Sequence, residues 1–234
     1  MPNATLTDGF LDLPYTQMVW IAPDSFIFQE GERESKPITF AKGFWAACYP
    51  VTQELYEKVT KGQNPAGFKG KHRPVEMVSW DDAQAFLEKL NQQVQLQDGL
   101  QFRLPSEAMW EYAARAKQPH RYSGSEVLSE VGWYSNNSYG QTMPLGLKEP
   151  NAFGLYDLSG NVWEWCADAT EDWQKMPIDK TPSDGLPYLS DRIEYNILRG
   201  GSYDVTDDFC RVVARSRLIR SNRWVKLGFR VFRY

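Results

Sequence analysis

The chain has 234 residues, of which 42% are apolar and 24% are charged. This length is enough to bury a substantial core, and this balance excludes an intrinsically disordered protein. Nine Trp, twelve Tyr and twelve Phe residues indicate a fold held together by large buried rings. No apolar run approaches a membrane span and residues 1–16 lack a signal-peptide pattern, so we expect a cytoplasmic protein without a membrane partner.

The formal net charge of −4 is unevenly distributed along the chain. Residues 211–234 contain eight basic residues and no acidic one, so the rest of the chain carries a formal −12. Either these basic residues pair with the acidic remainder, or they form a positively charged surface for an anionic ligand. The segment has no lysine-rich tract and matches no nucleic-acid recognition motif, so no nucleic-acid partner is expected.

Strand patterns dominate the first fifty residues. Residues 18–21 and 26–28 are rich in β-branched and aromatic side chains, and Pro23-Asp24-Ser25 between them predicts a tight turn. Residues 38–48 predict a further strand, interrupted at Gly43. Towards the end of the chain, residues 197–198 and 229–232 predict strands as well.

Three helices are indicated by hydroxyl residues that can cap an amphipathic run. They are residues 53–59 after Thr52, residues 80–90 after Ser79, and residues 107–116 after Ser106. Asp82 completes a capping box with Ser79. Glu111 and Arg115 are spaced to form an ion pair on the third helix.

Regular periodicity fades between residues 117 and 200, a stretch rich in Gly, Pro, Asn, Asp and Ser. The stretch keeps large aromatic side chains such as Trp163 and Trp165, which a disordered linker would not retain. We expect these two rings in the core; the alternative is a platform for a sugar or a base. The chain therefore predicts an N-terminal extension over residues 1–15 and a single α+β domain over residues 16–234.

The three cysteines and two histidines give no recognisable reactive or metal-binding pattern. Cys48, Cys166 and Cys210 lack the spacing of a metal site, and their odd number argues against a disulfide framework. His72 and His120 lie far apart in loop-like surroundings, so we expect neither to be a metal ligand.

Five sequence blocks carry a family resemblance. The longest reads GLYDLSGNVWEW at 154–165; the others are YPVT at 49–52, RPVEMVSW at 73–80, FRLPSE at 102–107 with WEYA at 110–113, and LRGGS at 198–202 with GFR at 228–230. In this order they resemble the formylglycine-generating enzyme, or sulfatase-modifying factor, family over residues 16–234. The resemblance implies a C-type-lectin-like fold with a small twisted antiparallel sheet, two or three helices and long ordered loops.

The same resemblance bears on catalysis. The family's oxidases bind copper(I) through cysteines at the third and eighth positions after the serine of the Gly-Gly-Ser motif. Counting from Ser202 places these positions at Val205 and Cys210. Valine offers no donor atom, so neither copper nor formylglycine generation is expected. If the chain is an enzyme, Ser202 and Cys210 are its candidate catalytic residues, and it is a related oxidoreductase or tailoring enzyme that uses another chemistry.

The resemblance also implies a structural calcium ion. In the family, the stretch that contains Asp157, Gly160, Val162 and Glu164 wraps calcium with two carboxylates and two backbone carbonyls. Calcium prefers such hard oxygen ligands. The alternative is that the two carboxylates cap loops and pair with nearby arginines.

The C-terminal segment between Ser202 and Gly228 is the candidate binding surface. The resemblance places the family's binding face there, and aromatic and arginine side chains often anchor interfaces. The layout is closest to the short variable proteins of diversity-generating retroelements. We therefore expect a ligand-binding module, fixed or diversified, that binds a protein or another macromolecule. The expected ligand-binding residues are Tyr203, Asp204, Asp207, Asp208, Phe209, Arg217, Leu218, Arg220, Arg223, Trp224 and Lys226.

Overall fold

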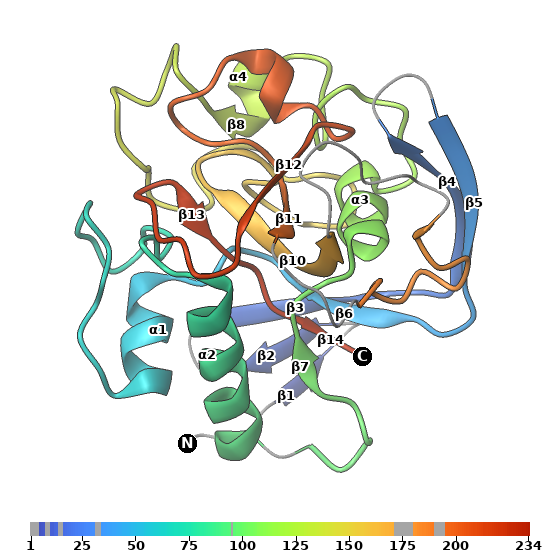
Figure 1. Ribbon diagram of the computed structural model, residues 1–234, viewed down its shortest axis with the longest axis horizontal. Helices are drawn as coiled ribbons and strands as arrows, with labels where there is room; N and C mark the ends of the chain where they lie inside the picture. Colours follow the sequence, from blue (N-terminus) through green and yellow to red (C-terminus); the bar gives the residue numbers. More distant parts are fainter. Residues whose placement is uncertain are drawn as a thin grey trace.

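A computed structural model describes residues 5–7, 10–13, 16–30, 34–94, 96–170, 180–189 and 195–234, with side chains described from residue 16 onward except at residues 30 and 34. Four helices and several small sheets make up the described part, so the predicted α+β fold class is confirmed. Figure 1 shows α1 and α2 side by side at one end of the larger sheet, and α3 between the smaller sheet and the β4–β5 hairpin. None of the described helices combines the length and the apolar character that a membrane crossing requires.

A six-stranded antiparallel sheet joins the start of the chain to its end. Its strands, in spatial order, are β1 (Thr5–Thr7), β2 (Phe10–Leu13), β3 (Thr16–Ile21), β6 (Phe44–Ala47), β14 (Phe232–Arg233) and β7 (Phe102–Arg103). The strands β1 and β2 lie inside the segment predicted as an N-terminal extension, yet β2 pairs with β3. Strands of three and four residues are too short for apolar alternation to reveal them in the sequence.

A four-stranded sheet carries the candidate site. Its order is β12 (Arg215–Ile219), β11 (Tyr195–Arg199), β10 (Trp163–Thr170) and β13 (Leu227–Gly228). The pairs within β10, β11 and β12 are antiparallel, whereas β13 runs parallel to β10. Consecutive segments of the C-terminus therefore lie on opposite edges of one sheet, and the chain between them crosses the face shown in Figure 1.

Two short pairings complete the strands. The hairpin of β4 (Asp24–Glu30) and β5 (Glu34–Phe40) is antiparallel, and β8 (Gly132–Trp133) pairs with β9 (Ser159–Gly160) in parallel. The predicted break at Gly43 separates β5 from β6. A Cβ atom on Gly43 would lie 2.4 Å from the ring of Trp20, so only glycine allows this close approach.

One predicted strand is wrong. Residues 229–232 do not form a continuous strand, because the chain crosses there from β13 in the smaller sheet to β14 in the larger one. The backbone N–H groups of Val51 and Ala47 donate to the carbonyls of Phe229 and Val231, and these bonds hold the crossing segment in place.

The three predicted helices are confirmed, each with its predicted N-cap. They are α1 (Gln53–Thr60), α2 (Trp80–Gln93) and α3 (Glu107–Arg115), capped by Thr52, Ser79 and Ser106. Both halves of the capping box between Ser79 and Asp82 are present. The four-residue helix α4 (Leu128–Val131) was not predicted, since a single turn shows no apolar periodicity.

Two large apolar clusters form the core. One lies between α1, α2 and the sheets and includes Trp163 and Trp165, which are 6% and 0% exposed. The expectation that these rings are core residues is therefore confirmed. The other cluster surrounds α3 and includes Trp110, Phe44 and Phe232. Both clusters contact the four-stranded sheet, so the C-terminal segment stands on a rigid base.

Candidate functional site

The segment that carries most of the predicted site residues begins at a double-glycine turn after β11. Gly200 and Gly201 both have left-handed backbone angles, with φ of 95° and 76°. A Cβ atom on Gly201 would lie 2.7 Å from the carbonyl oxygen of Phe209 and 2.8 Å from Sγ of Cys210. Glycine is therefore required for residues 203–210 to fold back against the turn.

Val205 and Cys210, the positions of the family's cysteine pair, meet at one small apolar cluster. Cys210 is fully buried beside Tyr122, and Val205 packs against the same cluster. Burial raises the pKa of the Cys210 thiol to about 12, so the sulfur keeps its proton at neutral pH. Cys48 and Cys166 are buried as well, and the structure shows no disulfide among the three cysteines. A protonated thiol beside an isopropyl group provides no pair of thiolate ligands for copper(I).

The other candidate catalytic group, Ser202, is also buried. Its hydroxyl donates to Oδ1 of Asp204 at 2.7 Å. This bond fixes the first turn of the segment after the glycines. Ser202 thus contributes to the shape of the loop that Asp204 belongs to.

The predicted binding residues divide into displayed and buried ones. Phe209 and Trp224 are 52% and 45% exposed, whereas Tyr203 is only 6% exposed and packs edge-on against Phe68 with ring centroids 5.5 Å apart. Leu218 is half-buried and packs against the larger core cluster. Tyr203 and Leu218 therefore support the segment from inside.

An ion pair joins the two halves of the segment. Nζ of Lys226, in the half that follows β12, lies 2.8 Å from Oδ2 of Asp204, in the half that precedes it. The same ammonium group lies over the ring of Trp224, 5.6 Å from its centroid. The structure thus brings Asp204, Trp224 and Lys226 together, as the sequence predicted for one surface.

The remaining predicted residues lie in two other places. Asp207 and Asp208 belong to the 3₁₀ helix η2 (Asp207–Cys210), where Oδ1 of Asp208 accepts from Arg121 at 2.8 Å. Arg217 lies on β12, with no carboxylate partner among the described residues. These side chains belong to the same segment but do not join the group around Trp224.

The loop between β12 and β13, residues 220–226, is fixed by α2. Arg220 pairs with Asp81 and lies over the ring of Trp80, 4.4 Å from its centroid. Arg223 donates from Nε and Nη2 to both carboxylate oxygens of Asp82, at 2.6 and 2.8 Å. The N-terminus of α2 therefore holds both arginines in defined positions.

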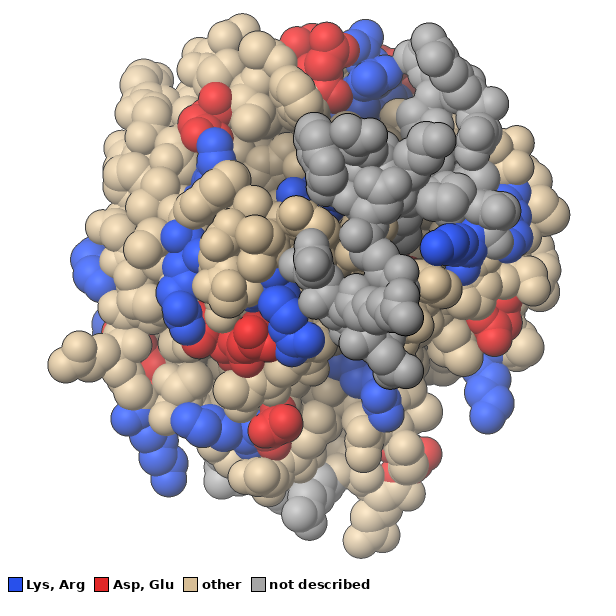
Figure 2. All heavy atoms as spheres, viewed as in Figure 1, with Lys and Arg blue, Asp and Glu red and all other residues tan. Residues whose placement is uncertain are grey.

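The C-terminal basic residues pair with acidic ones, which settles the question raised by their uneven distribution. Seven of the eight have a carboxylate partner: Arg211 with Asp208, Arg215 with Glu107, Arg220 with Asp81, Arg223 with Asp82, Lys226 with Asp204, Arg230 with Glu164 and Arg233 with Asp98. Figure 2 shows basic and acidic side chains interleaved on this face. The pairings therefore favour the first alternative, that the basic residues pair with the acidic remainder of the chain.

A buried ionic network fixes the start of the segment, and sequence reasoning missed it. Arg199, fully buried at the end of β11, donates to Oε2 of Glu111 at 2.6 Å and lies 3.5 Å from Oε1 of Glu107. Its terminal nitrogens also donate to the carbonyl oxygens of residues 212–214. Arg199 therefore ties α3 to the stretch between η2 and β12.

Glu107 and Glu111 are unusual because both lie on a helix that is buried almost all round. The predicted pair between Glu111 and Arg115 is present at 2.9 Å, but Glu111 also serves Arg199. Burial raises the pKa of Glu111, and the nearby arginines oppose that shift. The signal in the sequence was two carboxylates four residues apart on an otherwise apolar helix.

The predicted calcium ligands are buried, and they fit a cation only in part. Glu164 already accepts from Arg230 at 2.8 Å and from Nε1 of Trp110 at 2.8 Å. Asp157 accepts from the backbone N–H of Gly146 at 2.8 Å, with no arginine bonded to it. Burial raises the pKa of Asp157 to about 6, against hydrogen bonds from Gly146 and Asn161 and the charge of Arg230, which lower it. A calcium ion would therefore find a less fully paired carboxylate at Asp157 than at Glu164.

The carbonyl ligands of that prediction, Gly160 and Val162, lie on the same buried stretch. No group of three or more His, Cys, Asp or Glu side chains within the described residues is arranged to hold a metal. The calcium ion stays a prediction.

Comparison with known proteins identifies the family. Residues 6–234 match the sulfatase-modifying factor enzyme 1-like domain. The chain belongs to this family. It is 30% identical over 224 residues to the chaperone protein LppX of Paenibacillus barcinonensis, covering 75% of each chain. It is 29% identical over 225 residues to the formylglycine-generating enzyme of Thermomonospora curvata, covering 88% of this chain and 70% of that protein.

A solved structure agrees with this assignment. The Treponema denticola variable protein 1 superimposes with a TM-score of 0.82 at 29% identity, covering 93% of this chain and 94% of the other. The predicted family and the likeness to variable proteins are therefore both confirmed. The chain has the C-type-lectin-like fold of the formylglycine-generating enzyme family, and this fold carries the 202–228 segment.

Proposed function

We propose that this protein is a ligand-binding module that uses the β12–β13 loop surface, defined as Ile219, Arg220, Arg223, Trp224, Val225 and Lys226. The observation that carries the proposal is a fixed backbone with apolar side chains turned outward. The carbonyls of Arg220, Trp224 and Lys226 accept from the N–H groups of Trp80, Met77 and Trp163 at 2.9, 3.0 and 2.8 Å. Ile219, Trp224 and Val225 are nevertheless 44%, 45% and 38% exposed.

Such a loop is well suited to binding. Its side chains lose little conformational freedom when a partner docks, because hydrogen bonds and ion pairs already hold the backbone and the flanking arginines. Tryptophan and arginine are the residues most often found at the energetic centre of interfaces. The partner that fits is a protein or another macromolecule with an apolar patch surrounded by polar groups.

The relatives support binding in two ways. A chaperone and a variable protein are both named among the similar proteins, and the family's copper-binding pair is incomplete at Val205. In the retroelement version of the proposal, residues 203–226 differ between closely related copies of the gene. Sequencing such copies from related strains tests that version, since a fixed binder keeps one sequence.

The test of binding uses a displayed library of proteins, selected on the immobilised chain. A true partner binds the wild type, and Trp224→Ala weakens it by at least about thirtyfold, the loss expected for an interface hot spot. Trp20→Ala is the matched control, because Trp20 is 39% exposed on β3 in the other sheet. Equal affinities of the Trp224→Ala and Trp20→Ala variants for every selected partner would overturn the proposal.

The competing proposal is an oxidoreductase or tailoring enzyme, motivated by the relatives named formylglycine-generating enzymes. A bound redox metal would support it, so copper and iron are measured in freshly purified protein. Stoichiometric copper or iron would favour the enzyme. Metal-free protein that still binds its selected partner favours the binding module.

A further inference from the structure

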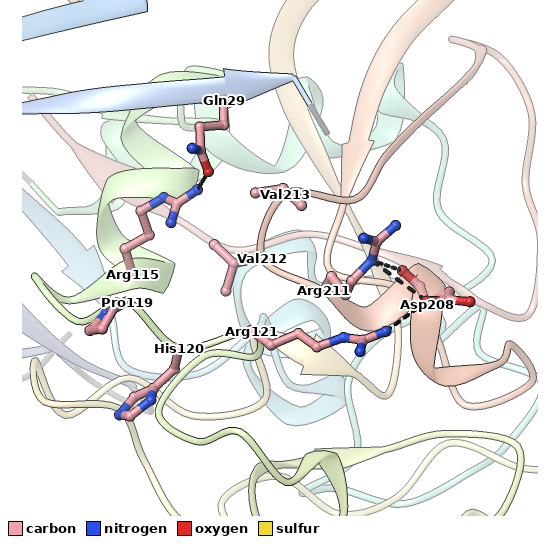
Figure 3. A pocket seen from close by; sticks show the side chains of 9 residues that line it. All are labelled: Gln29, Arg115, Pro119, His120, Arg121, Asp208, Arg211, Val212 and Val213. Atoms are coloured by element: carbon pink, nitrogen blue, oxygen red, sulfur yellow. Dashed lines mark hydrogen bonds and ion pairs between the residues drawn. The ribbon is translucent and has the colours of Figure 1, made fainter. Parts of the chain in front are cut away.

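A cavity beside the candidate segment is lined by charged side chains that do not belong to the β12–β13 loop surface. Its volume is about 430 Å³, within the range of small-molecule sites. It lies between the C-terminal end of α3, the following loop at 119–121, and the chain that leaves η2. Figure 3 shows Arg115 on one side, Arg121 and Arg211 on the other, and two valines between them.

Arg115 is held in position from behind. Its Nε donates to Oε1 of Glu111 at 2.9 Å, and one terminal nitrogen donates to Oε1 of Gln29 at 2.7 Å. The side chain is 17% exposed, and the other terminal nitrogen makes no bond within the described residues. The guanidinium group is therefore pre-oriented, with donors left for a ligand.

Arg121 lies on the loop after α3, extends its guanidinium group toward Asp208 (Figure 3) and is 45% exposed. Nη2 of Arg121 donates to Oδ1 of Asp208 at 2.8 Å, and Nε of Arg211 lies 3.8 Å from the same oxygen. Asp208 itself is 64% exposed, so this carboxylate is only loosely held. The position of the Asp208 carboxylate shows where the guanidinium groups of Arg121 and Arg211 hold an oxyanion. The oxyanion of a ligand can take the same place.

The cavity is not uniformly polar. Val212 and Val213 line it between the arginines, and His120 adds a further ring nitrogen. Nδ1 of His120 lies 3.3 Å from Oε1 of Glu126, an acidic residue outside the lining. A fitting ligand therefore has an oxyanion for the arginines of the cavity and an apolar body for the valines.

We infer that this cavity is a second binding site, which takes a small organic oxyanion, a phosphate ester or a carboxylate. Guanidinium groups bind both through paired, charge-assisted hydrogen bonds. The arginines of the cavity come from α3, the 119–121 loop and the residue that follows η2, and the β12–β13 loop contributes none of the lining. The inference therefore stands independently of the proposed function.

The experiment is isothermal titration of the full chain with inorganic phosphate, phenyl phosphate and benzoate at constant ionic strength. We expect saturable binding of at least one aromatic anion, and weaker binding of inorganic phosphate because it lacks the apolar body. Arg121→Gln should weaken the binding about tenfold or more, since it removes a charge-assisted hydrogen bond. Arg103→Gln is the matched control, because Arg103 is an exposed arginine on β7 that lies outside both the cavity and the β12–β13 loop surface.

The Asp208→Asn variant distinguishes anion binding from a merely structural role of these residues. Removing the competing carboxylate should tighten binding several-fold, opposite in sign to the effect of Arg121→Gln. Binding of phenyl phosphate alone assigns a phosphate ester, and binding of benzoate alone assigns a carboxylate. Heats of binding that depend only on ionic strength, or equal affinities of the Arg121→Gln and Arg103→Gln variants, overturn the inference.

Discussion

The same arginine–carboxylate pairing occurs in two regions of this protein and has a different effect in each. At the start of the C-terminal segment, Arg199 and its partners Glu107 and Glu111 are all fully buried. At the β12–β13 loop, Arg220 and Arg223 pair with aspartates on α2 and remain partly exposed. The buried pairs join α3 to the end of β11, and we call these two elements the frame. The exposed pairs position the β12–β13 loop at the surface.

Burial explains why the two regions differ. A buried charge that loses its partner keeps the whole cost of its desolvation, whereas an exposed one is rehydrated. Changes in the frame should therefore unfold the protein, and changes in the loop should alter binding with little effect on stability. The family scaffold can then keep its frame while the loop surface changes.

The largest expected effect is that of Arg199→Met. It leaves Glu107 and Glu111 buried with fewer cations and should cost about 3–5 kcal/mol of unfolding free energy. For a domain of this size, that lowers Tm by on the order of 10 °C. Thermal unfolding followed by circular dichroism measures the change.

Arg103→Gln is the control for that substitution, because Arg103 is an exposed arginine on β7. Its unfolding free energy should stay within about 0.5 kcal/mol of the wild type. If Arg199→Met melts together with this control, the buried network does not hold the frame and the comparison fails.

The sequence predicts the frame better than the site. N-cap hydroxyls at Thr52, Ser79 and Ser106 fixed the helix starts, because a cap depends on local hydrogen bonds that neighbouring residues determine. The crossing of residues 229–231 between two sheets depends on partners far along the chain. No local pattern reveals such pairing.

The site shows the same division. Family blocks located the segment and the missing cysteine at Val205, but not which side chains face outward. Tyr203 resembles an interface anchor by residue type, yet it is buried against Phe68. Val225 was not among the predicted residues, although it is 38% exposed beside Trp224. Exposure depends on tertiary packing, which residue type alone does not specify.

The next largest effect concerns a buried charge that the frame leaves without an arginine bonded to it. If calcium binds at Asp157, adding it to chelator-treated protein at about 100 times its Kd should stabilise the fold by about 2.7 kcal/mol. Differential scanning calorimetry with calcium, and with magnesium as the control ion, measures this. Asp157→Asn should abolish the gain. An equal response to magnesium, or no response to calcium, would contradict a calcium site at Asp157.

The smallest effect is expected at the exposed ion pair between Arg223 and Asp82, at the β12–β13 loop. Burial alone would raise the pKa of Asp82, but hydrogen bonds from Arg223 and Ser79 outweigh it, so the pKa lies below the ordinary value of 3.8. Asp82 therefore stabilises the folded state above about pH 4, and this contribution is lost as the pH falls further. Arg223→Gln removes part of it.

The unfolding free energies of the wild type and Arg223→Gln should therefore differ by up to about 1 kcal/mol at pH 7, as for other exposed ion pairs. The difference should shrink as the pH falls through 4, because Asp82 then becomes protonated in the unfolded state and next in the folded one. Urea unfolding at several pH values measures it, with Arg103→Gln as a variant whose difference should not change with pH. A difference of 3 kcal/mol or more, on the scale of a buried ion pair, would place Arg223 in the frame rather than in the loop.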